Sequence, residues 1–397
     1  MSWQLIELRH NHLRPKIYEA SDIYCDVFFD QIYTNPDGNY RFCCHASPVP
    51  SEHRMNSKTH TPFEWYKSDY MEEARNNIFD GIKNSGCETC YKMEERGGKS
   101  WRQIRHNQKT HTDIKEVKLN LALSNACNLS CYMCGPENST TKQVEMNNVF
   151  GKGSLEANTD FPGFALKRKN YERLKANILE NIAEVKYINL IGGEPLMIPE
   201  VWDLLDSISD KDAKRIHLCW ITNMTKVGYK NYSLEDVIEK YERVRFNISC
   251  DHFGEKESWM RYPIDIPSFE NNLVTYHNYI MQIQVTVGIL NGSDLIEIKE
   301  YYTKKFNLPV DFTNLVTPGT RGLSIAYYPR EHKEMLINKY KHDSCFDLVV
   351  ELLKVSLDMN EDDIKLQYSK DLDYCQKLSD YRKFQFKDIW KNTLPGI

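Results

Sequence analysis

Short apolar runs alternate with longer segments of helical periodicity through the middle of the chain. Amphipathic patterns such as residues 171–184 and 234–244 separate six runs of strand type, at residues 117–123, 185–191, 215–222, 244–249, 283–290 and 308–315. After the second strand these runs recur roughly every 25–40 residues, which is typical of βαβ units with parallel strands. The pattern therefore predicts an α/β fold, a partial (β/α)6 barrel with its chemistry at the carboxyl ends of the strands.

The regions on either side of this barrel have different patterns. Residues 1–110 are rich in turn residues and contain an NPDGN turn, at residues 35–39, between two short runs of strand type. Residues after 320 are highly charged, and their apolar positions recur at helical spacing. We expect three units: a small N-terminal cysteine-rich hairpin module (1–110), the barrel (115–320) and a C-terminal helical extension (321–397).

Composition narrows the classes of function. Lys plus Arg (51) nearly balance Asp plus Glu (56), so the chain lacks the overall positive field of a general nucleic-acid binder. The first residues contain no apolar stretch of signal-peptide length, and no run approaches the ~18 apolar residues of a membrane span. We therefore expect a cytoplasmic protein that does not contact a membrane. In a reducing compartment, its twelve cysteines indicate metal binding or catalysis rather than disulfides.

Three cysteines follow the first barrel strand within eight positions. Cys127, Cys131 and Cys134 have the spacing Cys-x3-Cys-x2-Cys. Structural zinc takes four ligands, usually as two pairs. Three thiols on one short loop suit a cubane iron–sulfur cluster that keeps one iron open for a substrate or cofactor. From the spacing alone, an incomplete zinc knuckle or a chance grouping stays an alternative.

A second motif follows the next strand. Gly192 and Gly193 lack side chains, which lets a ligand approach the backbone closely. Glu194 adds a carboxylate that can accept hydrogen bonds from an ammonium group, and Pro195 fixes the turn. Taken alone, this sequence is equally typical of an ordinary turn between a strand and a helix.

Together, "CNLSCYMC" and "GGEP" resemble the radical SAM superfamily. In that family three cysteines bind a [4Fe–4S] cluster whose open iron chelates S-adenosylmethionine, and reductive cleavage gives a 5′-deoxyadenosyl radical that abstracts hydrogen from substrate. The resemblance implies that Cys127, Cys131 and Cys134 are the ligands and that the Gly192–Pro195 turn holds the methionyl amino group. It also implies a one-electron reductant such as flavodoxin or ferredoxin.

Five residues on or after later strands also resemble positions of the radical SAM superfamily, in the same order along the chain. They imply contacts to the cofactor, although residues of these types also make turns and caps at strand ends. They are Thr222, Asn223, Asn247, Ser249 and Arg261.

The N-terminal region carries a second cysteine set. Cys25, Cys43 and the pair Cys87-x2-Cys90 make four ligands, which suits zinc or a cluster. Their spacing resembles the SPASM or twitch modules of radical SAM enzymes, which implies an auxiliary [4Fe–4S] cluster. The module precedes the barrel and lacks the longer SPASM series, so we expect one such cluster. Cys44 is the alternative to Cys43 because adjacent strand residues face opposite sides.

We expect a radical SAM oxidoreductase or maturase that carries out a net oxidation or a cross-link on a peptide or protein. Alternatives within the superfamily are a sugar-alcohol dehydrogenase and an RNA-modifying enzyme, although the acidic charge balance argues against nucleic acid. An alternative of another class is a non-catalytic zinc-binding interaction protein. No side chain stands out as a catalytic acid or base.

Overall fold

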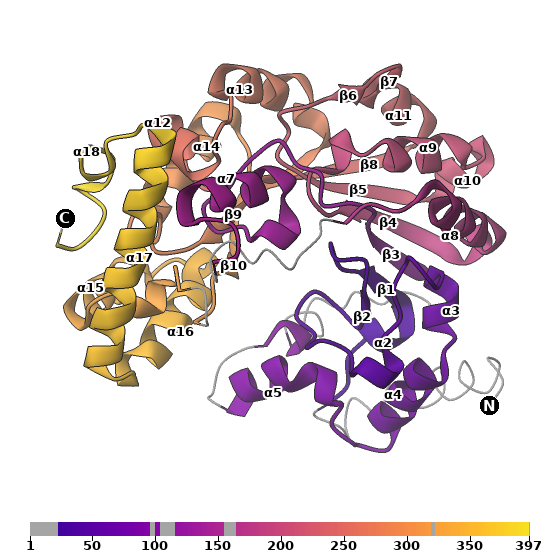
Figure 1. Cartoon of the computed structure of the whole chain (residues 1–397), viewed down its shortest axis with the longest axis horizontal. Coiled ribbons are helices and arrows are strands. Elements are labelled where there is room, and N and C mark those ends of the chain that lie inside the picture. The colour runs from indigo at the N-terminus through magenta and orange to yellow at the C-terminus, as the bar shows by residue number, and fades with distance from the viewer. Residues whose placement is uncertain (1–22, 96–99, 104–115, 155–163, 319–321, 397) are drawn as a thin grey trace.

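The computed structural model describes residues 23–95, 100–103, 116–154, 164–318 and 322–396 (Figure 1). Its main feature is a curved sheet of eight strands in the order β10-β9-β8-β5-β4-β3-β1-β2. β6 and β7 form a separate small ribbon. The strands are β1 Gln31–Thr34, β2 Tyr40–Arg41, β3 Val117–Ala122, β4 Val185–Ile191, β5 His217–Thr222, β6 Gly228–Tyr229, β7 Tyr232–Ser233, β8 Arg243–Ser249, β9 Ile280–Val287 and β10 Val310–Leu315.

The six strands predicted from the sequence are β3, β4, β5, β8, β9 and β10, and neighbouring strands among them are parallel. This confirms the predicted α/β fold and partial (β/α)6 barrel. β9 ends at Val287, three residues earlier than predicted. There the Gly288 amide donates to Asn291 Oδ1 (2.8 Å) and the Ile289 amide to the Leu323 carbonyl (2.8 Å), so a turn replaces the strand ladder.

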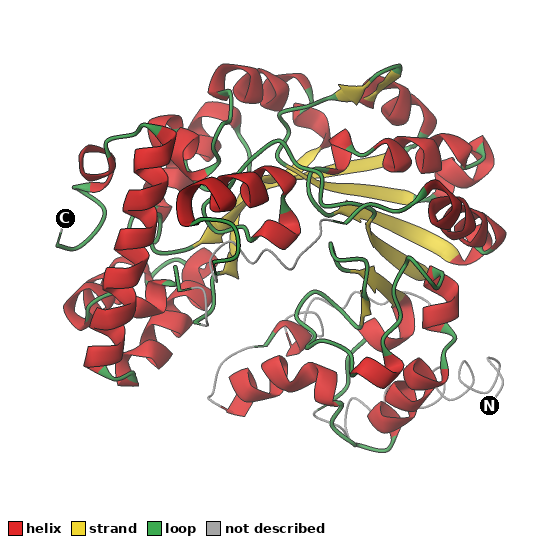
Figure 2. Ribbon diagram, in the orientation of Figure 1, coloured by secondary structure: helices red, strands yellow, loops and turns green. Residues whose placement is uncertain are grey.

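The helices between the strands of the barrel cover the outer face of the sheet (Figure 2). The helices are α2 Val27–Asp30, α3 Pro62–Tyr66, α4 Asp69–Phe79, α5 Glu88–Glu95, α7 Thr140–Phe150, α8 Arg168–Glu180, α9 Pro199–Ser207, α10 Asp210–Arg215, α11 Leu234–Lys240, α12 Gly254–Met260, α13 Ile266–Thr275, α14 Leu295–Phe306, α15 Arg330–Tyr340, α16 Asp347–Val355, α17 Glu361–Arg382 and α18 Phe386–Trp390.

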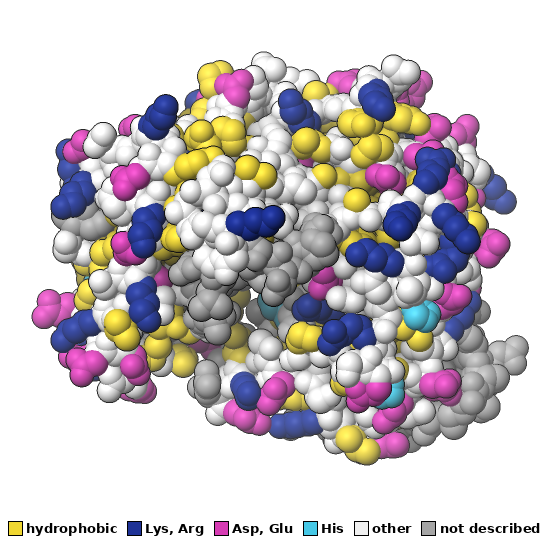
Figure 3. All heavy atoms as spheres, viewed as in Figure 1, with side chains coloured by type: hydrophobic (Ala, Val, Ile, Leu, Met, Phe, Trp, Pro, Cys, Tyr) yellow, Lys and Arg dark blue, Asp and Glu magenta, His cyan; other side chains and the backbone are white. Residues whose placement is uncertain are grey.

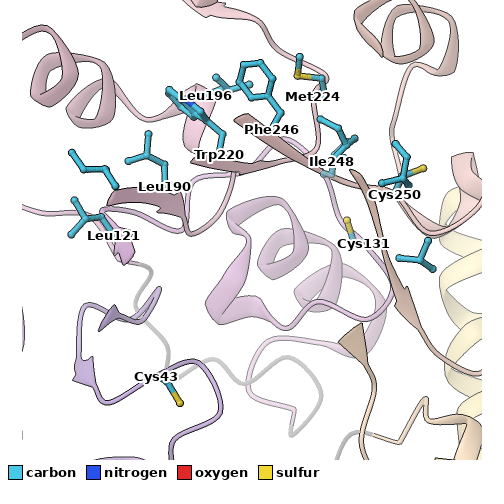
Figure 4. Packing of buried hydrophobic residues seen from close by; sticks show 14 of the residues in the cluster. Cys43, Leu121, Cys131, Leu190, Leu196, Trp220, Met224, Phe246, Ile248 and Cys250 are labelled. Carbon is cyan, nitrogen blue, oxygen red and sulfur yellow. The ribbon is translucent and has the colours of Figure 1, made fainter. Parts of the chain in front are cut away.

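Alternation along the strands separates a core from a concave face. Val244, Phe246 and Ile248 of β8 are buried in the core, while the residues between them point to the other side. Figure 4 shows Leu190, Trp220 and Phe246 on one side of the strands, and Cys131 and Cys43, which are also buried, on the other side. The concave face is therefore available for a site, whereas the outer face serves packing.

The N-terminal hairpin extends the barrel sheet. β1 pairs with β2 antiparallel around the predicted turn, in which Gly38 has φ +81° and its amide donates to the Asn35 carbonyl (2.8 Å). β1 also pairs with β3 in parallel, with Ile32 opposite Leu119. The cysteine-rich region is thus joined to the barrel by backbone hydrogen bonds, and its boundary at residue 110 stays a prediction.

The part after residue 321 is helical, as predicted. Its longest helix, α17, packs beside α7, and Trp390 of α18 is fully buried. Across the described residues, every helix is too short or too polar to cross a bilayer.

Candidate active site

The concave face of the sheet borders a cavity of about 2620 Å³. The loop after β3 and the N-terminal module approach it from different sides (Figures 3 and 4). Pro195, Cys25 and Cys87 are buried and do not line it. The other residues predicted for the site do line it: Cys43, Cys90, Cys127, Cys131, Cys134, Gly192, Gly193, Glu194, Thr222, Asn223, Asn247, Ser249 and Arg261.

Hydrogen bonds hold the three-cysteine loop, residues 123–134 after β3, in place. The Tyr132 amide donates to the Met260 carbonyl (2.9 Å), and Ser139 Oγ donates to the Leu129 carbonyl (2.6 Å). Thr141 Oγ1 donates to the Cys127 carbonyl (2.6 Å). The loop is therefore preorganised by groups from α12 and from the start of α7.

The three thiols of this loop lie close enough to perturb one another. A hydrogen bond with Cys134 and then burial raise the pKa of Cys131, and the same hydrogen bond lowers the pKa of Cys134. Burial, and then Cys131, raise the pKa of Cys127 to about 12. Three thiolates gathered on one loop repel one another, and a cationic metal centre would offset that repulsion.

The glycine turn after β4 lies directly against the cysteine loop. The Gly193 amide donates to the Ser124 carbonyl (3.1 Å), and the Glu194 amide donates to the Ala126 carbonyl (2.8 Å). A Cβ at Gly193 would lie 2.2 Å from the Ala126 carbonyl oxygen. The sequence argument took these glycines to admit a ligand, but the contacts show that they first admit the backbone of the cysteine loop.

Glu194 joins the ends of β4 and β5. Its carboxylate accepts hydrogen bonds from Thr222 Oγ1 (2.7 Å), the Asn223 amide (2.7 Å) and the Leu196 amide (3.1 Å). Burial raises the pKa of Glu194 to about 7, against these donors. Both carboxylate oxygens already have protein donors, so the geometry gives Glu194 a bridging role, and the predicted contact to an ammonium group stays a prediction.

Asn223 brings this bridge to the cysteines. Its Nδ2 lies 4.0 Å from Cys127 Sγ and donates to Asn128 Oδ1 (3.1 Å) within the cysteine loop. The end of β5, the turn after β4 and the cysteine loop therefore form one hydrogen-bonded unit.

Arg261 lies on the other side of the cysteine loop. Its Nη1 is 3.7 Å from Cys131 Sγ, and its Nε is 2.7 Å from Asp251 Oδ2. Burial alone would lower the pKa of Arg261, but Asp251 and the other anionic neighbours raise it well above its usual value. Sequence reasoning singled out Arg261 but missed Asp251 as its partner. The signal was a carboxylate placed ten residues earlier, directly after β8.

Asn247 and Ser249 lie on the concave face of β8. Asn247 Nδ2 is 3.5 Å from Cys219 Sγ of β5, and Asn247 Oδ1 is buried without a partner among the described residues. Ser249 is half-buried at the strand end nearest Arg261 and Asp251.

The N-terminal cysteines also form a group. Burial is the main cause that raises the pKa of Cys87, followed by Cys25 and Cys90. The pKa of Cys43 is raised by burial first and then by its neighbours, which include Cys25 and Cys87. Cys43 is buried, whereas Cys44 is exposed. Of the two adjacent cysteines, Cys43 is thus the buried one, and it lies near Cys25 and Cys87.

The donor chemistry of the two cysteine groups fits iron–sulfur clusters. All twelve cysteines are free thiols. Among the residues that the structure describes, no three His, Cys, Asp or Glu side chains group closely enough to hold one metal ion. In an iron–sulfur cluster the thiolates bind separate irons, so its ligands need not converge on one point. The two cysteine groups thus suit clusters, with Cys127, Cys131 and Cys134 in one and Cys25, Cys43, Cys87 and Cys90 in the other.

Residues 121–290 match the family model of the Radical SAM superfamily. No curated protein matches the chain. The structure of native anSMEcpe with bound AdoMet is 17% identical and covers 59% of this chain and 63% of that chain, with a TM-score of 0.40. The structure of TYW1 with a lysine-pyruvate adduct bound is 15% identical and covers 55% and 70%, with a TM-score of 0.31. The chain thus spans less than two thirds of the first of these structures, and both likenesses are too weak to carry an argument about activity.

Proposed function

We propose that this chain is a radical SAM oxidoreductase or maturase. The observation that supports the proposal most is the hydrogen-bonded unit of the cysteine loop, the Gly-Gly-Glu turn and the end of β5, with Arg261 beside Cys131. Three thiols, a glycine turn and a buried cation meet at the carboxyl ends of parallel strands, where barrel enzymes carry their chemistry.

In this proposal Cys127, Cys131 and Cys134 hold a [4Fe–4S] cluster. When bound with S-adenosylmethionine, this cluster supplies the electron that cleaves the sulfonium and yields a 5′-deoxyadenosyl radical for hydrogen abstraction. Arg261 stabilises the thiolate of Cys131 through its charge and remains oriented by Asp251. Asn223 orients the loop at Cys127, while the turn of Gly192 and Gly193 keeps its backbone against the loop.

We assign a second [4Fe–4S] cluster to Cys25, Cys43, Cys87 and Cys90, as in twitch-type enzymes. Cys43 and Cys90 line the same cavity as the first cysteine group, which supports a role in the same reaction. Such a cluster would accept an electron from a substrate radical, which makes the net reaction an oxidation or a cross-link, or it would anchor the substrate. The first cluster would take its electron from flavodoxin or ferredoxin.

The proposed substrate is a peptide or a protein segment. Sites for small molecules usually enclose about 300–1,000 Å³. The cavity here, about 2620 Å³, would hold S-adenosylmethionine as well as the substrate, and it is still larger than two small molecules usually require. A peptide strand accounts for that volume better than a sugar alcohol does.

Iron and sulfide analysis after anaerobic reconstitution tests the proposal. We expect about eight irons per wild-type chain, and about four in a C127A/C131A/C134A variant and in a C25A/C43A variant. The matched control is C345A, which removes a thiol from the α16 side of the protein and keeps about eight irons. A colourless protein that binds zinc instead would contradict both assignments.

A further inference from the structure

Two arginines lie on the concave face of β8, nearer the start of the strand than the proposed cofactor site at its end. The strand alternates Arg243, Arg245, Asn247 and Ser249 on this face with core residues on the other, and all four line the cavity. Both arginines are exposed to the cavity. At about 3.3 Å per residue of a parallel strand, Arg245 lies about 13 Å and Arg243 about 20 Å from Ser249 along the strand.

Neither arginine has a carboxylate partner among the residues that the structure describes. Arg243 Nη1 contacts His217 Nε2 of β5 at 2.5 Å, and Arg245 Nη1 donates to the Val244 carbonyl (2.8 Å). Burial, and then Arg243, lower the pKa of His217, so the imidazole is neutral at pH 7 and its Nε2 accepts from Arg243.

Nearby acids are held by other groups. Glu116 binds Lys186, which lies beside His217. Lys118 pairs with Asp30 at 3.3 Å. Asp311 of β10 faces the cavity but accepts from Gln282 Nε2 (3.2 Å) and Thr313 Oγ1 (2.9 Å). The positive charge of Arg243 and Arg245 is thus left open to a ligand.

Amide side chains continue this face from the arginines toward the cysteines. Asn120, Asn189, Asn247, Gln282 and Gln284 line the cavity from β3, β4, β8 and β9. Asn120 Nδ2 and Asn247 Oδ1 are buried without hydrogen-bond partners in the described part of the chain. Amides offer both donors and acceptors, which matches the alternating N–H and C=O groups of an extended peptide. Acidic side chains also line the cavity, among them Glu351 and Asp358, and they are a poor match to a nucleic-acid strand.

We propose that Arg243 and Arg245 bind a carboxylate of the peptide substrate, so that the enzyme selects acidic peptides. This inference rests on the proposed function, because the reacting residue then lies near Ser249. An extended peptide covers about 3.4 Å per residue, so the carboxylate is about four to six residues from the reacting residue. That carboxylate belongs to an Asp or Glu side chain or to the peptide's C-terminus.

Retention of defined peptide mixtures tests the inference. Anaerobically reconstituted protein is equilibrated with three mixtures of octapeptides that lack other charges: one with a single Asp and an amidated C-terminus, one with Asn in place of Asp, and one with Asn and a free C-terminal carboxylate. Mass spectrometry measures the bound fraction. We expect at least one carboxylate mixture to bind about tenfold to a hundredfold better than the amide mixture, as charge-assisted hydrogen bonds allow. The preferred mixture identifies which carboxylate is bound.

The variants separate recognition from folding. We expect R243Q/R245Q to bind all three mixtures equally, and R243E/R245E to prefer an octapeptide mixture with a single Lys. The matched control, K304Q/R330Q, removes the same charge from exposed helix surfaces and keeps the preference. Equal binding of the three mixtures by wild-type protein, no binding of any of them, or an unchanged preference in R243Q/R245Q would overturn the inference. Binding needs no cofactor cleavage, so iron content and 5′-deoxyadenosine formation in the same preparations report separately on the proposed function.

Discussion

Arg382 of the C-terminal extension fixes the cysteine loop from a distance in sequence. It is buried at the end of α17, and it forms two hydrogen bonds with the Glu145 carboxylate of α7, at 2.7 and 2.8 Å. It also donates to the carbonyl of Ser130, which lies between Cys127 and Cys131. We predict that R382M destabilises the protein and weakens the proposed first cluster.

Two lines of reasoning give the same magnitude for R382M. Breaking a buried ion pair by removing one partner costs about 3–5 kcal/mol. Burial alone would raise the pKa of Glu145, but Arg382 and Lys142 outweigh it and hold the pKa at about 2, from a usual value of 4.5. A lowering of that size corresponds to about 3 kcal/mol at neutral pH, and Arg382, Lys142 and Ser130 share this stabilisation. Because Lys142 remains 2.9 Å from Glu145 in the variant, we expect a loss of about 3 kcal/mol.

Denaturant unfolding of the metal-free protein at pH 7 measures this loss. The matched control is R330M, whose arginine is exposed on α15 and whose loss should stay within about 0.5 kcal/mol. Because the folded pKa of Glu145 lies below its unfolded value, its contribution is present above about pH 4.5 and is lost as the pH falls toward 2. The reasoning is refuted if R382M loses no more stability than R330M, or if its loss at pH 7 is no larger than its loss at pH 3.

Two further substitutions probe the unit around the cysteine loop. G193A should lose most of the iron of the first cluster, because its Cβ would lie 2.6 Å from the Ala126 carbonyl carbon and the backbone would have to shift. The control is G81A: Gly81 has φ +72° and open space around it, so G81A should lower stability but keep the iron. E194Q places an NH2 group opposite one of three donors, so it should lower the free energy of unfolding by about 1–3 kcal/mol. Iron analysis and denaturant unfolding check these outcomes, and wild-type values in either variant would contradict the described geometry.

The barrel could be predicted because its signals are local. Each strand alternates core and concave-face residues within a few positions, and β4 was predicted to the residue, Val185–Ile191. The addition of β1 to β3 could not be predicted in this way. Their paired residues, such as Ile32 and Leu119, are far apart in sequence, and the residues of one strand do not indicate which strand it pairs with.

In the candidate site, too, local motifs could be predicted, whereas contacts between residues far apart in sequence could not. The cysteine groups and the glycine turn were visible as motifs, but Arg382 was not, because its partners on α7 and the cysteine loop lie more than 200 residues away. Glu194 was identified with an ammonium contact in mind, and only the geometry gives its carboxylate three protein donors. The spacing of Arg243 and Arg245 was visible in the sequence, but a binding role could not be predicted from it. Only the fold shows that both side chains face the cavity.

The central claim is that the loop of Cys127, Cys131 and Cys134 holds a cluster that cleaves S-adenosylmethionine. Its most direct test is the amount of 5′-deoxyadenosine formed per chain by anaerobically reduced protein, compared between wild type, C127A and C345A. The account predicts the nucleoside from wild type and C345A, and none above background from C127A. Equal formation by C127A and wild type, or none from a wild-type protein with both clusters loaded, would contradict it.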